Sequence, residues 1–597
     1  MPANPNPLPT RPRRLHAAPG SAGFEVSAEI LMLLAALFWA LSANRGFLNA
    51  ALHGRQLADP TAWGFAAALL LALVGLNVLL LALLAHRRWL KPLLALVTVV
   101  TALGGHFMTT YGVYLDPTML RNALHSNPAE ARELFTGELV LHLALYAGLP
   151  LLLLRQVRIA PGPRRLWRAM ALRLMVLLLA VAVVAGAVLA VFQPLASLMR
   201  NHKELRYLIT PANVVWSMAA VAAADARGAA QPRQPIGLDV QPGPSWAARR
   251  KPLVVVLVVG ETARAANWGL NGYARQTTPE LAHRLLNPAA NSGSLVNFSL
   301  VTACGTNTET SLPCMFAPVG RRDYDEGRIR GQESLLHVAA RAGVAVHWRD
   351  NQSGCKGVCD TLPGDTVSAA KAPGLCAGGQ CLDEGLIGDL PQRLRAAANT
   401  VTGTVANTAS VGPTTQLWVL HMLGNHGPAY HRRVPPAFAR FQPACSSDDL
   451  RECTPAQIVN AYDNALLYTD HVLATAIAAL QAEAATVDSA LIYVSDHGES
   501  LGEHGLFLHG MPYAIAPDVQ KQVPMVAWFS PGLEAAAGLR PGCLLPALTR
   551  QAAAPVAHDH LFHTVLGLLD LRTALHVPAY DLSASCRAGP PPAKGPH

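Results

Sequence analysis

Acidic and histidine side chains follow three short apolar runs in the second half of the chain. They are Glu261 after the run 253–259, His421 and His426 after 417–420, and Asp496 and His497 after 490–494. Short apolar runs rich in Val, Leu and Ile are typical of strands buried in a parallel sheet. Because the carboxyl ends of parallel strands meet at one edge of the sheet, we expect these side chains to lie near one another.

The side chains at these strand ends include metal-ligand types. Glu261, Asp496 and His497 offer oxygen and nitrogen donors that suit zinc or manganese. Zinc takes four ligands, so a nucleophilic side chain would supply the fourth. An Asp-His pair after a single strand is also common in plain surface turns, whereas three such strand ends in one chain favour a metal site.

A hydroxyl-rich segment at 301–311 lies ahead of an expected helix start. Its sequence is Val-Thr-Ala-Cys-Gly-Thr-Asn-Thr-Glu-Thr-Ser. The free N–H groups and the dipole at a helix N-terminus favour an anion. A hydroxyl is a weak nucleophile at neutral pH, and a metal ion overcomes this by lowering the pKa of an oxygen ligand. From composition alone, we favour the simpler interpretation, a Ser/Thr loop that caps the helix.

The elements around these residues predict an α/β domain. The strand-like runs alternate with helical stretches, for example at 455–482. This alternation is typical of a mostly parallel sheet that helices cover on both faces. We therefore expect an α/β sandwich, with a mostly parallel central sheet, over residues 252–588.

The first third of the chain is strongly apolar. Of the 597 residues, 51% are hydrophobic and 14% are charged, which excludes intrinsic disorder, collagen-like fibres and small disulfide knots. Five apolar stretches each reach the length of about 20 residues that crosses a bilayer as a helix. They lie near 28–50, 62–86, 90–113, 136–156 and 169–193. We predict an α-helical membrane domain with five transmembrane helices over 28–194.

Basic residues in the short loops predict the orientation of this membrane domain. Lys and Arg are frequent in the tail 1–27 and in the loops 86–91 and 155–168, and sparser in the two alternate loops. The N-terminus is therefore expected in the cytoplasm, and five crossings place the chain after residue 195 outside it. The net charge of +9 then fits contact with anionic lipid, and we expect no nucleic acid partner.

A bridge is expected between the two domains, over 195–251. Residues 195–227 carry basic side chains on a helical pattern. These side chains either contact lipid headgroups or are simply exposed to solvent. Residues 228–251 are rich in Gly, Pro, Gln and Arg and indicate a linker. The tail 1–27 is rich in Pro, Ala and Arg, so we expect it to be disordered. It lacks the apolar core of a signal peptide, so we expect no cleavage, and we expect the tail 589–597 to be flexible.

All ten cysteines lie after residue 300, and eight of them form close sequential pairs. Zinc-binding cysteine modules use repeated short spacings, whereas the four spacings here all differ. Irregular short loops closed by cysteines are typical of disulfides in an oxidising compartment. The cysteines and the loop charges therefore independently place the second half of the chain outside the cytoplasm.

Four motifs give the chain a resemblance to a known family. They are Val-Val-Gly-Glu-Thr-Ala-Arg at 258–264, the segment 302–316 with Cys-Gly-Thr-Asn-Thr-Glu-Thr-Ser-Leu-Pro-Cys, Asn-His-Gly-Pro at 425–428, and the segment 495–509. In order and spacing the chain resembles the lipid A phosphoethanolamine transferases, membrane members of the alkaline phosphatase and sulfatase superfamily. The resemblance runs from the first membrane helix to about Cys586.

The resemblance implies a catalytic nucleophile and a metal site. Thr308 matches the nucleophile of the family. Glu261, Asp496 and His497 match its zinc ligands, and Thr308 completes the coordination. One zinc ion is expected on this basis, and a second metal is compatible with the pattern.

The resemblance also implies residues that contact the substrate. His426 and His509 match histidines that bind the substrate or a second metal, and Lys356 matches a contact to the substrate phosphate. Gln352 and Glu499 match polar groups near the phosphoethanolamine.

Structural residues follow from the same resemblance. The family disulfides match Cys304–Cys314, Cys355–Cys359, Cys376–Cys381 and Cys445–Cys453, which leaves Cys543–Cys586 as the fifth pair. The resemblance gives no role to His504, His558, His560 or His563, which we take as structural.

The implied activity is the transfer of phosphoethanolamine from phosphatidylethanolamine to lipid A phosphates through a phosphothreonine intermediate. This would make lipopolysaccharide less anionic and lower its affinity for polymyxin and cationic peptides. We expect a monomer in the inner membrane of a Gram-negative bacterium, among membrane lipids, with its catalytic domain in the periplasm. Alternatives are transfer to core heptose or Kdo, a phosphoglycerol transferase, and a metal-dependent phosphatase- or sulfatase-type hydrolase.

Overall fold

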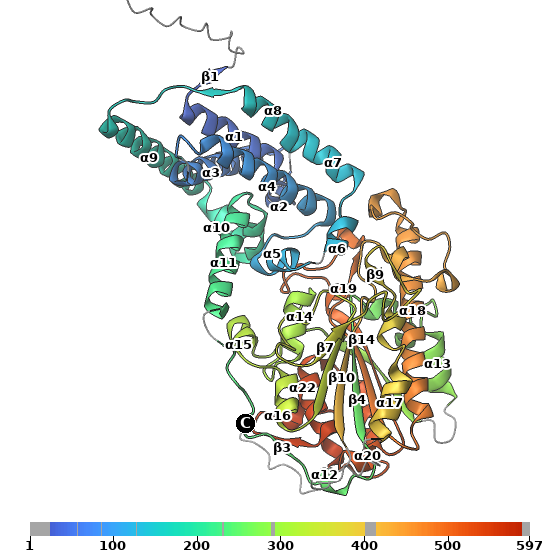
Figure 1. Ribbon diagram of the computed structural model, residues 1–597. Coiled ribbons are helices and arrows are strands. Elements are labelled where there is room, and N and C mark those ends of the chain that lie inside the picture. The colour runs from blue at the N-terminus through green and yellow to red at the C-terminus, as the bar shows by residue number, and fades with distance from the viewer. Residues whose placement is uncertain are drawn as a thin grey trace, which may run out of the picture. The chain divides into compact units, whose positions relative to one another are not determined.

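The computed structural model describes residues 24–56, 58–84, 86–126, 128–229, 232–287, 293–399 and 414–587. The chain divides into two compact units (Figure 1). The helical unit comprises the chain up to Leu48, Leu52–Ala102 and Leu141–Leu195, and the α/β unit comprises Asn49–Ala51, Leu103–Val140 and the chain from Ala196. Most of the expected tail 1–27 and all of the tail 589–597 lie outside the described residues.

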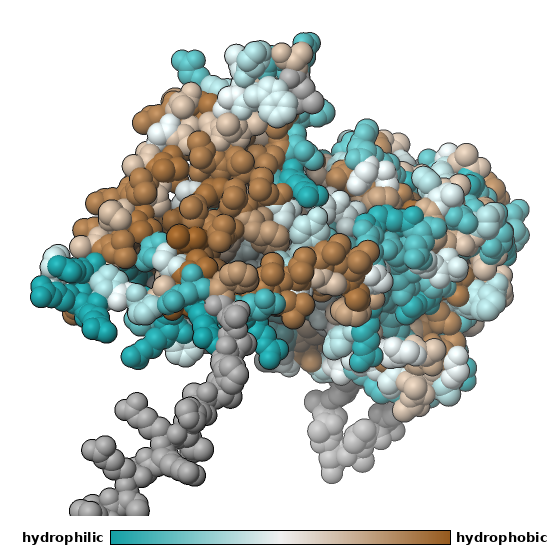
Figure 2. Space-filling view, turned by 90° about the horizontal axis from the view of Figure 1, so that it is seen from above, coloured by the Kyte–Doolittle hydropathy of each residue, from teal (hydrophilic) through white to brown (hydrophobic). Residues whose placement is uncertain are grey.

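Long apolar helices form the membrane-spanning part of the chain. They are α1 (Ala28–Ser42) with α2 (Arg45–Leu52), α3 (Pro60–Leu84), α4 (Leu90–Tyr111), α7 (Gly137–Leu143) with α8 (Leu149–Gln156), and α9 (Leu166–Ala190). Many of their leucines are exposed, and Figure 2 shows a broad hydrophobic area on the molecular surface. An exposed apolar surface of this extent fits contact with lipid. The predicted membrane domain with five helical spans is therefore confirmed.

The first predicted span, near 28–50, is bent rather than straight. α1 and α2 meet with a bend of 56°. Asn44, between them, donates a hydrogen bond from its side-chain Nδ2 to Trp39 O at 3.0 Å. The same oxygen also accepts the regular helix bond from Ala43 N at 3.0 Å, so the side chain of Asn44 adds a cap to the end of α1.

Helices α3 and α9 pack closely against each other. Gly75 of α3 faces Val184 of α9, and a Cβ atom at Gly75 would come within 2.8 Å of Val184 Cγ2. Small residues of this kind let membrane helices approach one another closely. Arg173 of α9 donates to Ala82 O and Leu83 O at 3.0 Å each, which supplies donors to the last carbonyls of α3.

The α/β unit is organised around an eight-stranded sheet (Figure 1). In spatial order its strands are β15 (Val556–Ala557), β5 (Ser294–Thr302), β14 (Gln522–Phe529), β11 (Asp488–Ser495), β4 (Leu253–Gly260), β10 (Thr415–His421), β6 (Ala345–Asp350) and β7 (Gly364–Thr366). β14 runs antiparallel to both of its neighbours, and the other pairings of the sheet are parallel. The prediction of a mostly parallel central sheet is confirmed.

Helices cover both faces of this sheet, as Figure 1 shows. α16 (Leu335–Arg341) and α22 (Asp559–Leu569) pack on one face, and α13 (Pro279–Leu286), α17 (Leu390–Asn399) and α18 (Pro455–Ala482) on the other. Alternate side chains of β4 enter the two resulting cores, which is why its sequence is one unbroken apolar run. α18 is long and apolar enough to cross a membrane, but most of its side chains are buried within the α/β unit.

The segment expected as one bridging helix, 195–227, consists of several elements. They are α10 (Phe192–Asn201), a 3-10 turn (Lys203–Leu208) and α11 (Ala212–Ala229). Pro211 stands directly before α11, where its ring and its missing N–H prevent a continuous helix. The bridge is therefore a jointed connection rather than a single rod.

Part of the chain between two membrane spans belongs to the α/β unit. Residues Leu103–Val140 include α5 (Pro117–Leu124) and α6 (Pro128–Glu133), and α5 packs against α11 and α14 (Thr308–Met315). On α6, Glu133 Oε2 lies 2.6 Å from Arg433 Nη2, and both side chains are almost fully buried. These contacts fix α5 and α6 within the α/β unit.

Candidate active site

The carboxyl ends of three adjacent strands meet at one edge of the sheet. β4 ends at Gly260 directly before Glu261, and β11 ends at Ser495 directly before Asp496 and His497. Ser495 and Gly260 lie opposite each other in the strand register, so the side chains that follow them emerge together. The expectation that these strand ends converge is met by the fold.

Glu261, Asp496 and His497 form a buried cluster. One donor atom from each lies within 4.8 Å of the others, and all three side chains are fully buried. His497 Nε2 is 3.3 Å from Glu261 Oε1 and 3.2 Å from Asp496 Oδ2. Within the described part of the chain, neither of these carboxylate oxygens has a hydrogen-bond partner. Two buried carboxylates with free oxygens that face one imidazole fit a divalent metal ion.

The pKa values in the cluster show its need for positive charge. Burial raises the pKa of Asp496, and the negative charge of Glu261 raises it further. Burial would also raise the pKa of Glu261, but the close contact with His497 outweighs it and lowers this pKa. Burial disfavours the imidazolium of His497, yet the two carboxylates raise its pKa to about 9. Without a metal ion, the proton on His497 is therefore the cation that balances the carboxylates.

Thr308 places a hydroxyl in this cluster. It is the first residue of α14, and the helix is capped by Asn307, whose side chain accepts a hydrogen bond from Thr310 N at 2.9 Å. Because Asn307 provides the cap, the hydroxyl of Thr308 is not needed for capping. Thr308 Oγ1 instead donates to Glu261 Oε2 at 3.0 Å and lies 3.3 Å from His497 Nε2. The hydroxyl therefore completes a set of four side chains at one point.

Two further histidines lie beside the cluster. The ring of His509 is 4.4 Å from that of His497 and 5.4 Å from that of His426. Glu499 lies 2.8 Å from His509 Nδ1 through Oε2 and accepts from Tyr430 OH through Oε1 at 2.7 Å. Both oxygens of Glu499 are thus engaged in holding His509 and Tyr430. Burial lowers the pKa of His426 to about 3, so that its imidazole is neutral at physiological pH.

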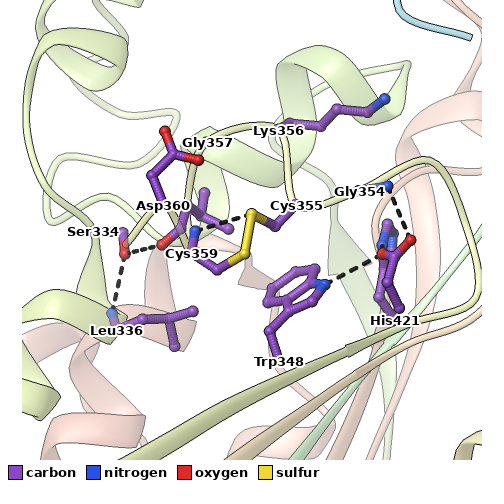
Figure 3. The surroundings of a disulfide bond; sticks show 12 residues. Ser334, Leu336, Trp348, Gly354, Cys355, Lys356, Gly357, Cys359, Asp360 and His421 are labelled. Carbon is purple, nitrogen blue, oxygen red and sulfur yellow. Dashed lines mark hydrogen bonds and ion pairs between the residues drawn. A yellow bond between two sulfur atoms is a disulfide. The ribbon is translucent and has the colours of Figure 1, made fainter. Parts of the chain in front are cut away.

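Gln352 and Lys356 approach the site on one loop. Gln352 Nε2 donates to Glu261 Oε2 at 3.2 Å. Lys356 Nζ donates to Ser353 Oγ at 2.7 Å and lies 3.9 Å from the carboxylate of Glu309, the residue after Thr308. Figure 3 shows Lys356 on the short loop that the Cys355–Cys359 disulfide closes. The loop therefore places the ammonium group of Lys356 beside Glu309, near the start of α14.

Most candidate site residues therefore gather around Glu261, Asp496 and His497, and Lys356 lies beside Glu309, whereas the supporting residues were missed. Tyr430 stands two residues after the Asn-His-Gly-Pro motif at 425–428. Its hydroxyl, so close to a motif, could have marked it as a residue of the site. Asp350, at the end of β6, was missed because its strand alternates polar and apolar residues and was not recognised.

Disulfides and a structural histidine brace the site. The structure joins Cys304–Cys314, Cys355–Cys359, Cys376–Cys381 and Cys445–Cys453, the pairs that the resemblance implies, and also Cys543–Cys586, the pair left by elimination. His558 Nδ1 accepts from Cys304 N at 3.1 Å, and its Nε2 lies 2.9 Å from Ser495 O. His558 thus connects the segment before Thr308 to the end of β11.

Family models match both halves of the chain. The model described as phosphoethanolamine transferase EptA/EptB matches residues 73–226, and the sulfatase model matches residues 254–571. The two matched regions correspond to most of the membrane-spanning part and to the α/β domain that carries the site.

Characterised proteins match the chain over nearly its whole length. The phosphoethanolamine transferase EptA of Escherichia coli K12 is 35% identical, over 93% of this chain and 96% of that protein. The phosphatidylethanolamine transferase Mcr-1 of Escherichia coli is 35% identical, over 92% and 95%. The structure of the integral membrane lipooligosaccharide phosphoethanolamine transferase A (EptA) from Neisseria meningitidis superposes with a TM-score of 0.85 at 34% identity, over 95% of this chain and 100% of that chain.

Proposed function

We propose that this chain, which belongs to the EptA/EptB family of phosphoethanolamine transferases, moves phosphoethanolamine from phosphatidylethanolamine to a phosphate group of lipid A. The observation that carries the proposal is the hydroxyl of Thr308, which is held by Glu261 and His497 at the start of a helix. The relatives EptA and Mcr-1, which are named as a phosphoethanolamine transferase and a phosphatidylethanolamine transferase, match more than nine-tenths of the chain. Their near-complete coverage supports the transfer of phosphoethanolamine, and lipid A is the acceptor that we propose.

In the first step, Thr308 Oγ1 attacks the phosphorus of phosphatidylethanolamine. The new O–P bond forms as the bond from phosphorus to the glycerol oxygen breaks, and diacylglycerol leaves with a proton on that oxygen. Glu261 Oε2, 3.0 Å from Oγ1, accepts the hydrogen bond of the attacking hydroxyl and is placed to take its proton. The product is phosphoethanolamine linked to Thr308.

Zinc is the metal that we propose for Glu261, Asp496, His497 and Thr308, where it would lower the pKa of the hydroxyl and neutralise phosphate charge. The surrounding residues act on the same phosphate. Thr308 is the first residue of α14, and the N-terminus of a helix favours an anion. Lys356 adds a positive charge beside it, so that the phosphate oxygens are met from two directions.

His509 is the residue that we propose as the proton donor to the leaving oxygen. Its Nδ1 lies 2.8 Å from the carboxylate of Glu499, a contact that orients the ring. His426 is neutral because burial lowers its pKa, which suits it to hydrogen bonding with the substrate rather than to acid catalysis. In the second step the lipid A phosphate attacks the phosphothreonine, and Thr308 recovers its proton.

Both substrates are membrane lipids, which fits a site joined to membrane-spanning helices. Attachment to the bilayer raises the effective concentration of the site for lipid substrates. We propose a monomer in the inner membrane, with the N-terminus in the cytoplasm and the catalytic domain in the periplasm. The product carries an added ammonium group, so lipid A binds polymyxin and other cationic peptides less strongly.

The test uses the purified full chain with vesicles of phosphatidylethanolamine, with and without lipid A. Mass spectrometry of lipid A should show added phosphoethanolamine with the wild type, none with Thr308→Ala, and a reduced amount with Thr308→Ser. Consumption of phosphatidylethanolamine that is equally fast without lipid A would instead indicate a hydrolase. Undiminished modification by Thr308→Ala would overturn the proposal.

A further inference from the structure

A buried pair, His421 and Asp350, lies at the strand ends next to the metal cluster. The two residues end the neighbouring parallel strands β10 and β6 and lie opposite each other in the register. His421 Nδ1 is 2.8 Å from Asp350 Oδ1, and both side chains are buried. A carboxylate only accepts hydrogen bonds, so Nδ1 carries the hydrogen of this contact. The proposed reaction uses neither residue.

Asp350 organises the backbone at the start of the loop that follows β6. Its Oδ2 accepts from Gln352 N at 3.2 Å and from Gly354 N at 2.9 Å. Its Oδ1 accepts from Trp348 Nε1 at 3.2 Å in addition to the bond from His421. Figure 3 shows Trp348, Gly354 and His421 gathered at this end of the loop. The rotamer of one carboxylate therefore sets the course of the chain into the loop.

Separate contacts hold the far end of the same loop. The Cys355–Cys359 disulfide closes it, and Ser334 Oγ donates to Val358 O at 2.6 Å. Between the two anchors, Lys356 has a φ of 47°, in the left-handed region that residues with a side chain rarely adopt. Because this conformation is unfavourable by itself, the position of Lys356 depends on the anchors at both ends.

We infer that His421 is a positioning residue, which acts through Nδ1 on Asp350 to hold the loop that presents Lys356 to the substrate phosphate. This inference rests on the proposed function, which gives Lys356 its contact with that phosphate. His421 Nε2 is buried and, among the described residues, has no hydrogen-bond partner. A direct role of His421 in the site would use Nε2, whereas the positioning role uses Nδ1. Substitutions that keep only one of these nitrogens therefore distinguish the two roles.

The experiment replaces His421 by asparagine, glutamine and leucine in the full-length protein. The amide nitrogen of asparagine lies close to the place of Nδ1, that of glutamine close to the place of Nε2, and leucine has neither. We expect His421→Asn to keep kcat/KM for phosphatidylethanolamine within about threefold of wild type. We expect His421→Gln and His421→Leu to lower it by about tenfold or more, mainly through KM, because a bond to a charged acceptor is lost.

A double-mutant cycle shows whether His421 acts through the loop. In a Lys356→Ala background, His421→Leu should cause little further loss, because the residue that it positions is already absent. His563→Leu is the matched control: it removes an equally buried imidazole, whose Nδ1 accepts from Val577 N at 3.2 Å, and should leave KM unchanged. Metal content, measured by atomic emission, should match wild type in every His421 variant.

Four results would overturn the inference. They are activity in His421→Gln that equals wild type, loss in His421→Asn that equals the loss in His421→Leu, additive losses with Lys356→Ala, and a lowered metal content in the His421 variants. The comparison of His421→Asn with His421→Gln tests the positioning role even if His421→Leu does not fold. Wild type and Thr308→Ala are assayed in parallel, so a wild type without transfer activity counts against the proposed function and not against the positioning role.

Discussion

Replacement of Asp496 by asparagine tests whether a cation holds the buried carboxylates together. The free oxygens of Glu261 and Asp496 lie within 4.8 Å of each other. Two charges at that separation repel by about 3.5 kcal/mol at an effective dielectric constant of about 20. Because protonated His497 offsets part of this repulsion, we expect Asp496→Asn to stabilise the metal-free protein by about 1–3 kcal/mol. The same substitution removes a ligand of the proposed metal site, so metal retention and transfer should be lost.

The assay is thermal unfolding of the detergent-solubilised protein with a chelator and with zinc. Zinc should stabilise the wild type strongly and Asp496→Asn hardly at all. The folded state raises the pKa of Asp496 above its ordinary value, so the metal-free wild type loses stability as pH rises through that interval. Asp496→Asn lacks this loss, and its advantage over the metal-free wild type should grow from about pH 4 toward neutrality.

A matched control separates this effect from the general cost of changing a buried aspartate. Asp383 is equally buried, but its oxygens accept from Asn351 Nδ2, Leu423 N and Gly424 N at 2.7–2.9 Å. Asp383→Asn should therefore destabilise the protein with or without metal. The reasoning is refuted if Asp496→Asn destabilises the metal-free protein as Asp383→Asn does.

Three further predictions concern packing and buried charge. Glu133→Gln leaves the buried guanidinium of Arg433 without its carboxylate and should lower the free energy of unfolding by about 3–5 kcal/mol. The unfolding temperature should fall accordingly, and replacement of both residues by apolar ones should restore it. Burial lowers the pKa of His558 to about 4, so the unfolded chain binds this proton first and the protein should lose stability as pH falls from about 6.5 to 4. His558→Gln should flatten that part of the pH profile, and an unchanged profile would contradict the assignment. Gly75→Ala should lower the unfolding temperature by crowding α9, whereas Gly186→Ala, which faces open space, should not; equal effects would argue against close packing there.

The convergence of Glu261, Asp496 and His497 can be predicted because they follow continuous apolar runs, whereas Thr308 is singled out only by the family resemblance. β4, β10 and β11 are buried on both faces, so each run is recognisable without knowledge of its neighbours, and Glu261 and Asp496 follow two of them. Their convergence at one edge follows from parallel strands alone. The antiparallel direction of β14 could not be predicted in this way, because a strand buried on both faces has the same apolar pattern in either direction.

Residues that support the centre are harder to predict because their partners are distant in the chain. Asp350 meets His421 from 71 residues away, and Tyr430 meets Glu499 from 69 residues away. No local pattern marks such pairs before the strands and loops are placed. The bend between α1 and α2 could not be predicted either, because the hydropathy of the stretch 28–50 predicts one helix.

Covalent capture of the reaction intermediate tests the central claim most directly. The full-length protein is incubated with phosphatidylethanolamine in the absence of an acceptor, digested, and analysed by tandem mass spectrometry. We predict one phosphoethanolamine group on Thr308, its disappearance when lipid A is added, and no such group in Thr308→Ala. Transfer that proceeds with the group on another residue, or with no covalent adduct at all, would contradict the account.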